Sequence, residues 1–201
     1  MLPDHGAPAD APGVRPLPGE IRTQRLVLRR WRRADAPLFK AAIDANLAAL
    51  QRWIPWAKDE PSALDVIEER MARFESEFDA GKEWLFAIRS RISHGVLGGV
   101  GLYPRVGPRA VEIGYWLQMS AYGQGFATEA TEALTRLALK QPDIERVEIR
   151  CDPRNAPSAA IPRRLGYRHA RTIESETGPN GELRDTMIWV MTRSHNSGKG
   201  E

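Results

Sequence analysis

The stretch from Glu112 to Glu132, EIGYWLQMSAYGQGFATEATE, constrains the fold more than any other part of the chain. Its apolar residues first alternate and then recur every three or four positions, so the period changes from that of a strand to that of a helix. Between the two periods, Gly123 and Gly125 allow a sharp turn and the close approach of a ligand to the backbone. The first N–H groups of a helix lack partners within it and lie at the positive end of its dipole. The stretch therefore predicts a strand, a turn and a helix that together form an anion site.

The predicted strand has two different sides. One side carries Val111, Ile113, Tyr115 and Leu117, and the other carries Glu112, Gly114 and Trp116. The helix that follows has an apolar stripe made of Ala130, Ala133, Leu134, Leu137 and Ala138. Both elements are therefore expected to pack against a core.

A Gly-x-Gly pair is also typical of an ordinary turn, but here its neighbours are informative. YGQGFATEA after EIGYWL resembles the acetyl-CoA pyrophosphate loop of the GNAT superfamily of N-acetyltransferases, in the form used by the RimJ/RimL branch that modifies ribosomal proteins. The resemblance covers about residues 20 to 193. It implies acetyl-CoA as the cofactor, bound by Leu117, Gln118, Met119, Gly123, Gln124, Gly125, Phe126, Ala127 and Thr128.

A second motif lies in DPRNAPSAAIPRRLGY, residues 152–167. Asn155 is a good N-cap and Pro157 suits a first turn, so the segment predicts a short capped helix. The same spacing resembles the last cofactor-contacting segment of the superfamily, which implies that Asn155 holds the pantetheine arm and that the Ser158 hydroxyl faces the sulfur of CoA. Pro162 departs from the family pattern. It cannot donate to the carbonyl of Ser158, so the helix is expected to kink or to be short.

The segment from Asn46 to Ala57 contains two tryptophans, Trp53 and Trp56, on either side of Ile-Pro. These residues suit a simple core. The segment also resembles the Leu-x-x-Trp-x-Pro-Trp stretch of the same branch, a loop between the first two helices that borders the acceptor pocket. We therefore expect Trp53, Trp56 and the strand residue Trp116 to lie near the acceptor.

Attack of an amine on a thioester requires a group that takes the proton of the amine. Glu112 is the candidate base, acting directly or through water, because a carboxylate beside aromatic and apolar groups has a raised pKa; the equal alternative is a structural salt bridge. A backbone N–H near Leu117 would polarise the thioester carbonyl, and Ser158 would protonate the departing thiolate or hydrogen-bond it. The single cysteine, Cys151, is interpreted as a core residue with no catalytic part. No metal-ligand cluster is visible.

The element order predicts an α+β fold with a mixed, largely antiparallel sheet flanked by helices, and the resemblance implies that the strands framing the central helix splay apart. Residues 1–20 are expected to be a disordered tail, 21–193 one domain and 194–201 a polar tail. The helix after Asp35 is expected to bury Leu38, Ala41, Ala42 and Ala45, and a turn is expected at Thr177–Gly181.

Composition favours the cytoplasm, because the chain has one cysteine, no signal peptide and no apolar run long enough to span a bilayer. A net charge of +3 argues against strong nucleic-acid binding. The basic cluster Arg29, Arg30, Arg32 and Arg33 suits a solvated strand end better than an RNA-binding arm.

The sequence therefore predicts an acetyl-CoA-dependent N-acetyltransferase that acts by direct transfer, as a monomer or homodimer, on a ribosomal or other protein N-terminus. A small-molecule acceptor (an amino acid, a polyamine or an aminoglycoside) stays open. So does a non-catalytic acyl-CoA-binding or RNA-associated module.

Overall fold

The computed structural model describes residues 16–177 and 181–196. Most of the two predicted tails, and the centre of the turn predicted at Thr177–Gly181, lie outside these residues. None of the helices in the described ranges combines the length and the apolar character needed to cross a membrane.

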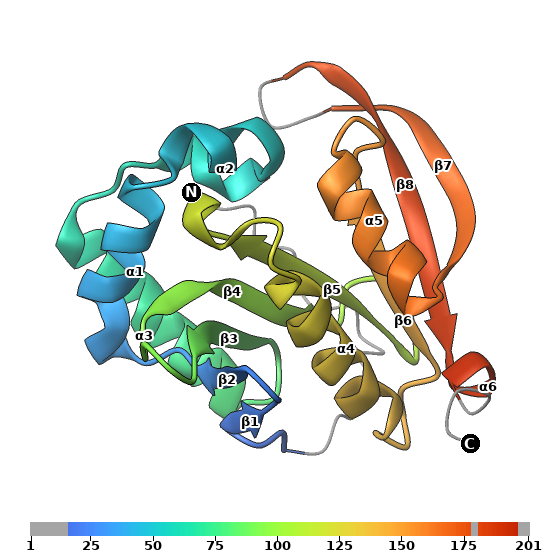
Figure 1. Ribbon diagram of the computed structural model, residues 1–201, viewed down its shortest axis with the longest axis horizontal. Coiled ribbons are helices and arrows are strands. Elements are labelled where there is room, and N and C mark those ends of the chain that lie inside the picture. The colour runs from blue at the N-terminus through green and yellow to red at the C-terminus, as the bar shows by residue number, and fades with distance from the viewer. Residues whose placement is uncertain (1–15, 178–180, 197–201) are drawn as a thin grey trace.

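Eight strands form one mixed sheet in the order β1-β2-β3-β4-β5-β6-β8-β7 (Figure 1). The strands are β1 (Glu20–Arg22), β2 (Leu26–Arg30), β3 (Trp84–Ser90), β4 (Val96–Tyr103), β5 (Ala110–Leu117), β6 (Arg146–Cys151), β7 (Arg168–Thr177) and β8 (Leu183–Thr192). Every neighbouring pair is antiparallel except β5 and β6. The predicted α+β class with a largely antiparallel sheet is confirmed.

The parallel pair β5 and β6 separates soon after it forms. Its register contains only Ala110 with Arg146, Val111 with Val147 and Glu112 with Glu148. Beyond these pairs β5 continues to Leu117 and β6 to Cys151 without pairing to each other. The expected splay is therefore present, and it leaves the β6-facing backbone of the second half of β5 without a strand partner.

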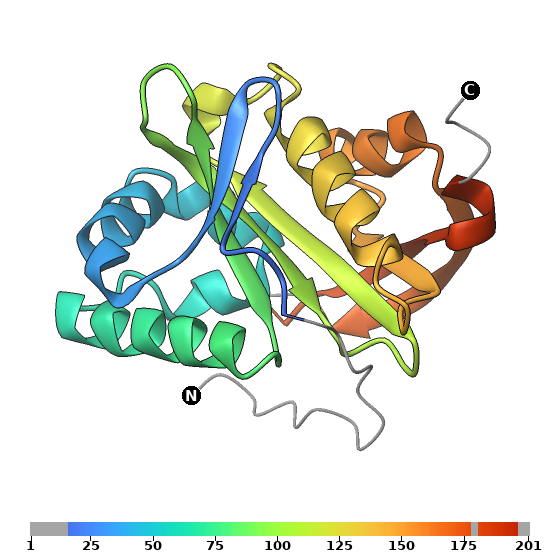
Figure 2. The ribbon, with the colours of Figure 1, turned by 90° about the horizontal axis from the view of Figure 1, so that it is seen from below.

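The helices cover the two faces of the sheet separately (Figure 2). They are α1 (Ala36–Asp44), α2 (Leu47–Trp53), α3 (Leu64–Asp79), α4 (Phe126–Leu139), α5 (Ala156–Leu165) and the short terminal α6 (Arg193–Asn196). Buried residues of α4 and α5 join one apolar core with β5, β6 and β8, whereas α1, α2 and most of α3 belong to a second core on the other face. Trp116 packs against this second core, so β5 contributes to both, as its two different sides predict.

Two predictions about the N-terminal helices are wrong. The segment expected to be a loop contains α2, which ends at Trp53 immediately before the turn at Pro55. In α1 the buried residues are Ala36, Phe39, Ala42 and Ile43, so Ala42 is the one predicted residue that is buried, whereas Ala41 and Ala45 are exposed and Leu38 is 48% exposed. The large side chains Phe39 and Ile43 lie four positions apart and set the buried face, which turns Leu38 outward.

The glycines inside β4 make room for β5. A Cβ atom on Gly98 would lie 2.1 Å from the carbonyl oxygen of Trp116, and one on Gly99 would lie 2.6 Å from the Nε1 atom of its indole. Larger residues at these positions would displace either the strand or the indole. The group that approaches these glycines is the backbone and side chain of Trp116.

Candidate active site

The glycine turn connects β5 to α4 through a short 3-10 turn, Met119–Ala121. Gly123 and Gly125 have φ angles of +73° and +78°, which residues with a side chain rarely adopt. Gly125 is the N-cap of α4 and gives no side-chain cap, and the first bond inside the helix runs from the N–H of Glu129 to the carbonyl of Gly125. The N–H groups of Phe126, Ala127 and Thr128 therefore remain available to an anion.

Two of the residues predicted to bind the cofactor, Gln118 and Met119, have backbone amides that already donate to other groups. The N–H of Gln118 donates to the carbonyl of Leu97 at 2.7 Å. The N–H of Met119 donates to the Oδ1 atom of the buried Asn46 side chain, also at 2.7 Å. Any contact that these two residues make with a cofactor would use their other atoms.

Leu117 presents its amide to the open gap. Consecutive N–H groups of a strand point to opposite sides, and that of Gln118 points to β4. The N–H of Leu117 therefore points toward β6, where the splay has removed the partner strand. A donor of this kind suits a developing oxyanion.

On the opposite side of the gap, Asn155 and Ser158 begin α5. The Oδ1 atom of Asn155 accepts a hydrogen bond from the N–H of Ser158 at 3.3 Å, so the predicted N-cap is confirmed. The Ser158 hydroxyl lies 3.2 Å from the phenolic oxygen of Tyr115, on β5. Burial raises the pKa of Tyr115, and the hydrogen bond to Ser158 only partly opposes this effect, so the phenol stays protonated at neutral pH.

The helix is not stopped at Pro162, because α5 continues to Leu165. The carbonyl of Ser158, which loses its helical donor to the proline ring, accepts a hydrogen bond from the Tyr115 hydroxyl at 3.1 Å. The phenol thus bridges β5 and α5 across the splay. This contact was not predicted from the sequence, which placed Tyr115 on the side of its strand that also carries Val111, Ile113 and Leu117.

Cys151 is buried at the end of β6. Burial raises the pKa of its thiol to about 11, and the polar groups of Trp189 and Ser158 only partly oppose the rise. A thiol of this kind is a weak nucleophile at neutral pH.

Glu112 lies at the other end of β5. Its two carboxylate oxygens accept from the Nη2 and Nε atoms of Arg105 at 2.9 and 3.0 Å, and the Nε atom of Arg150 lies 3.8 Å away. Leu117 lies five positions after Glu112 along the extended strand, a span of about 17 Å. The ion pair is the arrangement expected of the structural alternative, and the distance excludes direct action of Glu112 at a thioester beside Leu117.

The three predicted acceptor-side tryptophans do not form one group. Trp56 and Trp116 have ring centroids 6.5 Å apart and share the second core with Phe39. Trp53 instead lines a surface hollow of about 260 Å³ together with Arg52, Arg154 and Glu182. The hollow is formed by α2, the turn before α5 and the β7–β8 hairpin, which are distant in the sequence.

The described residues contain no group of three or more His, Cys, Asp or Glu side chains placed to hold a metal ion. The chemistry that this geometry supports is anion binding at the loop, polarisation of a carbonyl at Leu117 and hydrogen bonding at Ser158.

A family model, that of the acetyltransferase (GNAT) domain, matches residues 25–168. The chain is 26% identical over 181 residues to the uncharacterized N-acetyltransferase p20 of Bacillus licheniformis, and the match covers 89% of this chain and 98% of that protein.

Two solved structures are similar in fold. RimL, the ribosomal L7/L12 alpha-N-protein acetyltransferase solved with coenzyme A, has a TM-score of 0.80 and 22% identity over 88% of this chain and 99% of its own. The microcin C7 self-immunity acetyltransferase MccE, solved with acetyl-CoA and AMP, has a TM-score of 0.79 and 19% identity over 88% and 98%.

Proposed function

The chain belongs to the acetyltransferase (GNAT) domain family and is an acyltransferase that uses acetyl-CoA. From this premise we propose that it transfers the acetyl group directly to a protein N-terminal amine. The observation that carries the proposal is the splay of β5 from β6, with a glycine-turned helix N-terminus on one side and Ser158 on the other. Acetyl-CoA brings an activated acyl thioester, so the protein must bind it, orient it and manage protons.

The residues of the gap fit an acyl-CoA. The space in front of Gly123 is open, since a Cβ atom there would have no neighbour within 4 Å. The available amides from Gly125 to Thr128 would hold the pyrophosphate, with Phe126 and Ala127 between them. The carboxylate nearest the start of the helix, Glu129, is paired with Arg25 at 2.6 Å and therefore does not repel an anion with its full charge.

Each side of the gap has a separate proposed task. Asn155 would hold the pantetheine arm, and the N–H of Leu117 would polarise the thioester carbonyl. Ser158 would donate a proton or a hydrogen bond to the departing thiolate. The Tyr115 phenol supports this role because it fixes the position of the Ser158 backbone and hydroxyl.

The amine must lose a proton, and Glu112 was the candidate base. Its pairing with Arg105 and its distance along β5 favour the structural role, so any action of Glu112 at the reacting amine would have to pass through water. We propose that the amine reaches the site neutral or transfers its proton to water.

The acceptor side is proposed to lie among α2, the turn before α5 and the β7–β8 hairpin, where Trp53 lines the hollow with Arg52 and Arg154. The name of RimL, an alpha-N-protein acetyltransferase, supports a protein N-terminus as the acceptor. MccE, solved with AMP, supports the alternative of a small-molecule acceptor. The single cysteine supports a reducing compartment such as the cytoplasm.

Release of CoA from acetyl-CoA across a panel of amines tests the proposal. The panel contains peptides that begin with Ser, Ala or Met, the same peptides blocked at the N-terminus, and an amino acid, a polyamine and an aminoglycoside. We expect turnover with unblocked peptides and its loss on blocking. Turnover with the small amines alone would assign the alternative acceptor, and binding of CoA without any turnover would assign a non-catalytic module.

A further inference from the structure

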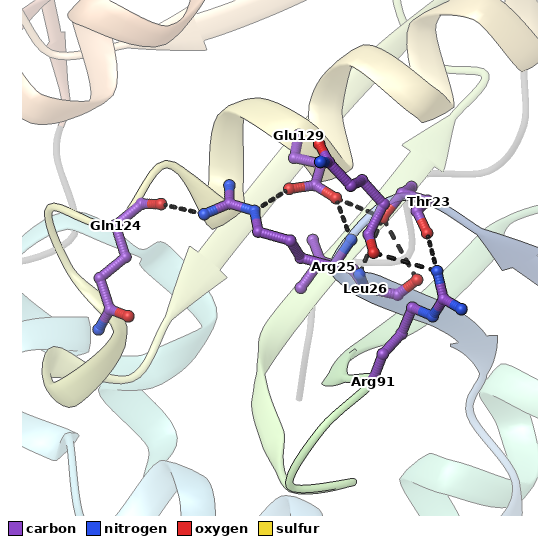
Figure 3. A network of polar contacts seen from close by, with 7 residues as sticks. Thr23, Arg25, Leu26, Arg91, Gln124 and Glu129 are labelled. Carbon is purple, nitrogen blue, oxygen red and sulfur yellow. Dashed lines mark hydrogen bonds and ion pairs between the residues drawn. The ribbon is translucent and has the colours of Figure 1, made fainter.

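A network of polar contacts joins the turn between β1 and β2 to the first turn of α4 (Figure 3). One carboxylate oxygen of Glu129 accepts from the Thr23 hydroxyl at 2.6 Å and from the N–H of Arg25 at 2.8 Å, and the other accepts from the Nε atom of Arg25 at 2.6 Å. We call Thr23, Arg25 and Glu129 the clasp. The clasp joins segments more than 100 positions apart in the sequence, since 104 positions separate Arg25 from Glu129.

The guanidinium of Arg25 also reaches the cofactor loop itself. Its Nη1 atom donates to the backbone carbonyl of Gln124 at 2.8 Å, and its central carbon lies 4.7 Å from the centre of the Phe126 ring. These contacts hold the guanidinium on one side of the loop, although the Arg25 side chain is 44% exposed.

The bond to Gln124 fixes the direction of the next amide. The peptide bond between Gln124 and Gly125 is trans, so its C=O and N–H point in opposite directions. Because the carbonyl of Gln124 points to Arg25, the N–H of Gly125 points away from Arg25. It joins the available amides at the start of α4.

Gly125 makes this peptide unit easy to rotate. The unit turns about ψ of Gln124 and φ of Gly125, and Gly125, with φ of +78°, also adopts negative φ at little cost because it is glycine. In the rotated arrangement the Gln124 carbonyl would face the anion and repel it. A contact that selects one orientation therefore affects binding of the anion without touching it.

We propose that Arg25 is a positioning residue for the cofactor, which turns the Gln124–Gly125 peptide so that the N–H of Gly125 faces the pyrophosphate of CoA. This inference rests on the proposed function, since it presumes that the loop binds CoA. Glu129 has a second part in the clasp. It holds Arg25 in place, and its own negative charge beside the anion site is offset by Arg25.

The charge state of Glu129 agrees with this role. Partial burial raises the pKa of its carboxyl, but the hydrogen bonds from Thr23, from the Arg25 N–H and from the Arg25 side chain outweigh that effect and lower the pKa overall. Glu129 is therefore ionised at neutral pH, as an anchor for a guanidinium must be.

The test is Arg25→Ala, with the dissociation constants of CoA and of 3′-dephospho-CoA measured by calorimetry and with acetyl-CoA kinetics measured in parallel. Loss of one charge-assisted hydrogen bond should weaken binding about tenfold. The loss should be equal for the two probes, because both contain the pyrophosphate. The KM for acetyl-CoA should rise by the same factor, while kcat at saturation and the KM for the amine should stay near those of the parent.

The matched control is Arg91→Ala. Arg91 donates from Nη1 to the carbonyls of Thr23 and Gln24, both at 3.0 Å, and so supports the same turn without contacting the loop. Its removal should leave both dissociation constants unchanged. An equal loss in Arg91→Ala would mean that general loosening of the turn weakens binding, and would overturn the inference.

Three other outcomes would overturn the positioning role of Arg25 or the proposed function. A loss confined to CoA would show that Arg25 binds the 3′-phosphate directly, and would overturn the positioning role. If the parent binds CoA and Arg25→Ala binds it with the same affinity, this inference alone is overturned. Absence of CoA binding by the parent would overturn the proposed function with it.

Discussion

At the scale of single residues, Pro162 and Tyr115 show how a break in one element is repaired by another. Proline removes the helical donor to the Ser158 carbonyl, and the Tyr115 hydroxyl, from β5, takes its place. The Tyr115 side chain is long enough to reach from β5 to α5, so this hydrogen bond also connects the two sides of the splay at Ser158.

The double-mutant cycle of Tyr115→Phe and Pro162→Ala tests this repair. Tyr115→Phe leaves a half-buried carbonyl without a partner and should lower the free energy of unfolding by about 1–2 kcal/mol in urea denaturation. Pro162→Ala returns an N–H to that carbonyl, so its benefit should be larger in the Tyr115→Phe background than in the parent. Strictly additive effects would show that the two residues do not share the Ser158 carbonyl.

At the same scale, comparison with Glu148 tests whether the role of Glu112 is structural or catalytic. Both carboxylates are buried on neighbouring strands and paired with arginines, Glu112 with Arg105 and Glu148 with Arg146. We expect Glu112→Gln and Glu148→Gln each to lower the free energy of unfolding by about 1–2 kcal/mol, because each leaves an arginine without its partner. The kcat of both variants should stay near that of the parent.

A different result would restore the catalytic role of Glu112. If Glu112→Gln, but not Glu148→Gln, lowers the rate by about 10²–10⁴ and high pH partly rescues it, then Glu112 acts as a base through water.

At the scale of elements, the unit from β5 through the glycine turn to α4 could be read from the sequence because its signals are local. The change of period places the strand and the helix, and two glycines mark a backbone that needs positive φ. The N-cap at Asn155 was predictable for the same reason, since cap and helix lie within one short segment.

Elements whose form depends on distant partners were not predictable. The stripe of α1 was assigned to Leu38, but Phe39 packs edge-on against Trp31 and faces Trp56 and Trp116 across the second core. Helix α2 was read as a loop because Pro55 dominates the local pattern, while the helix ends just before it. Arg25 and Asn46 carried no local signal, since their partners Glu129 and Met119 are distant in the sequence.

The glycine turn provides a prediction with an internal control. Gly125→Val and Gly181→Val place a β-branched residue at nearly the same φ, +78° and +77°. The backbone strain is therefore matched, but only Gly125 lies at the start of α4, where an added Cβ would approach Arg25 to 3.4 Å. We expect calorimetry to show loss of CoA binding in Gly125→Val and parent-like affinity in Gly181→Val. Unchanged binding in Gly125→Val would show that the loop does not hold the cofactor.

At the scale of the whole molecule, the splay connects the two layers of the fold. One core, with α4 and α5, supports the glycine turn and Ser158, and the other, with α1 to α3, supports Trp56 and Trp116. β5 belongs to both, and its free edge, from the last β6 pair at Glu112 to Leu117, opens between them. This arrangement places Leu117, the proposed donor to the thioester carbonyl, at the end of that free edge.

The central claim is direct transfer of an acetyl group to a protein α-amine, and mass spectrometry of both product and protein tests it most directly. The purified protein is mixed with acetyl-CoA and a peptide that has a free α-amine and an internal lysine. We predict one added acetyl group, located on the α-amine, and no change in the mass of the protein at any time, because the pKa of the Cys151 thiol is raised to about 11. An acetyl group trapped on Cys151, or a product modified only at the lysine, would contradict the account.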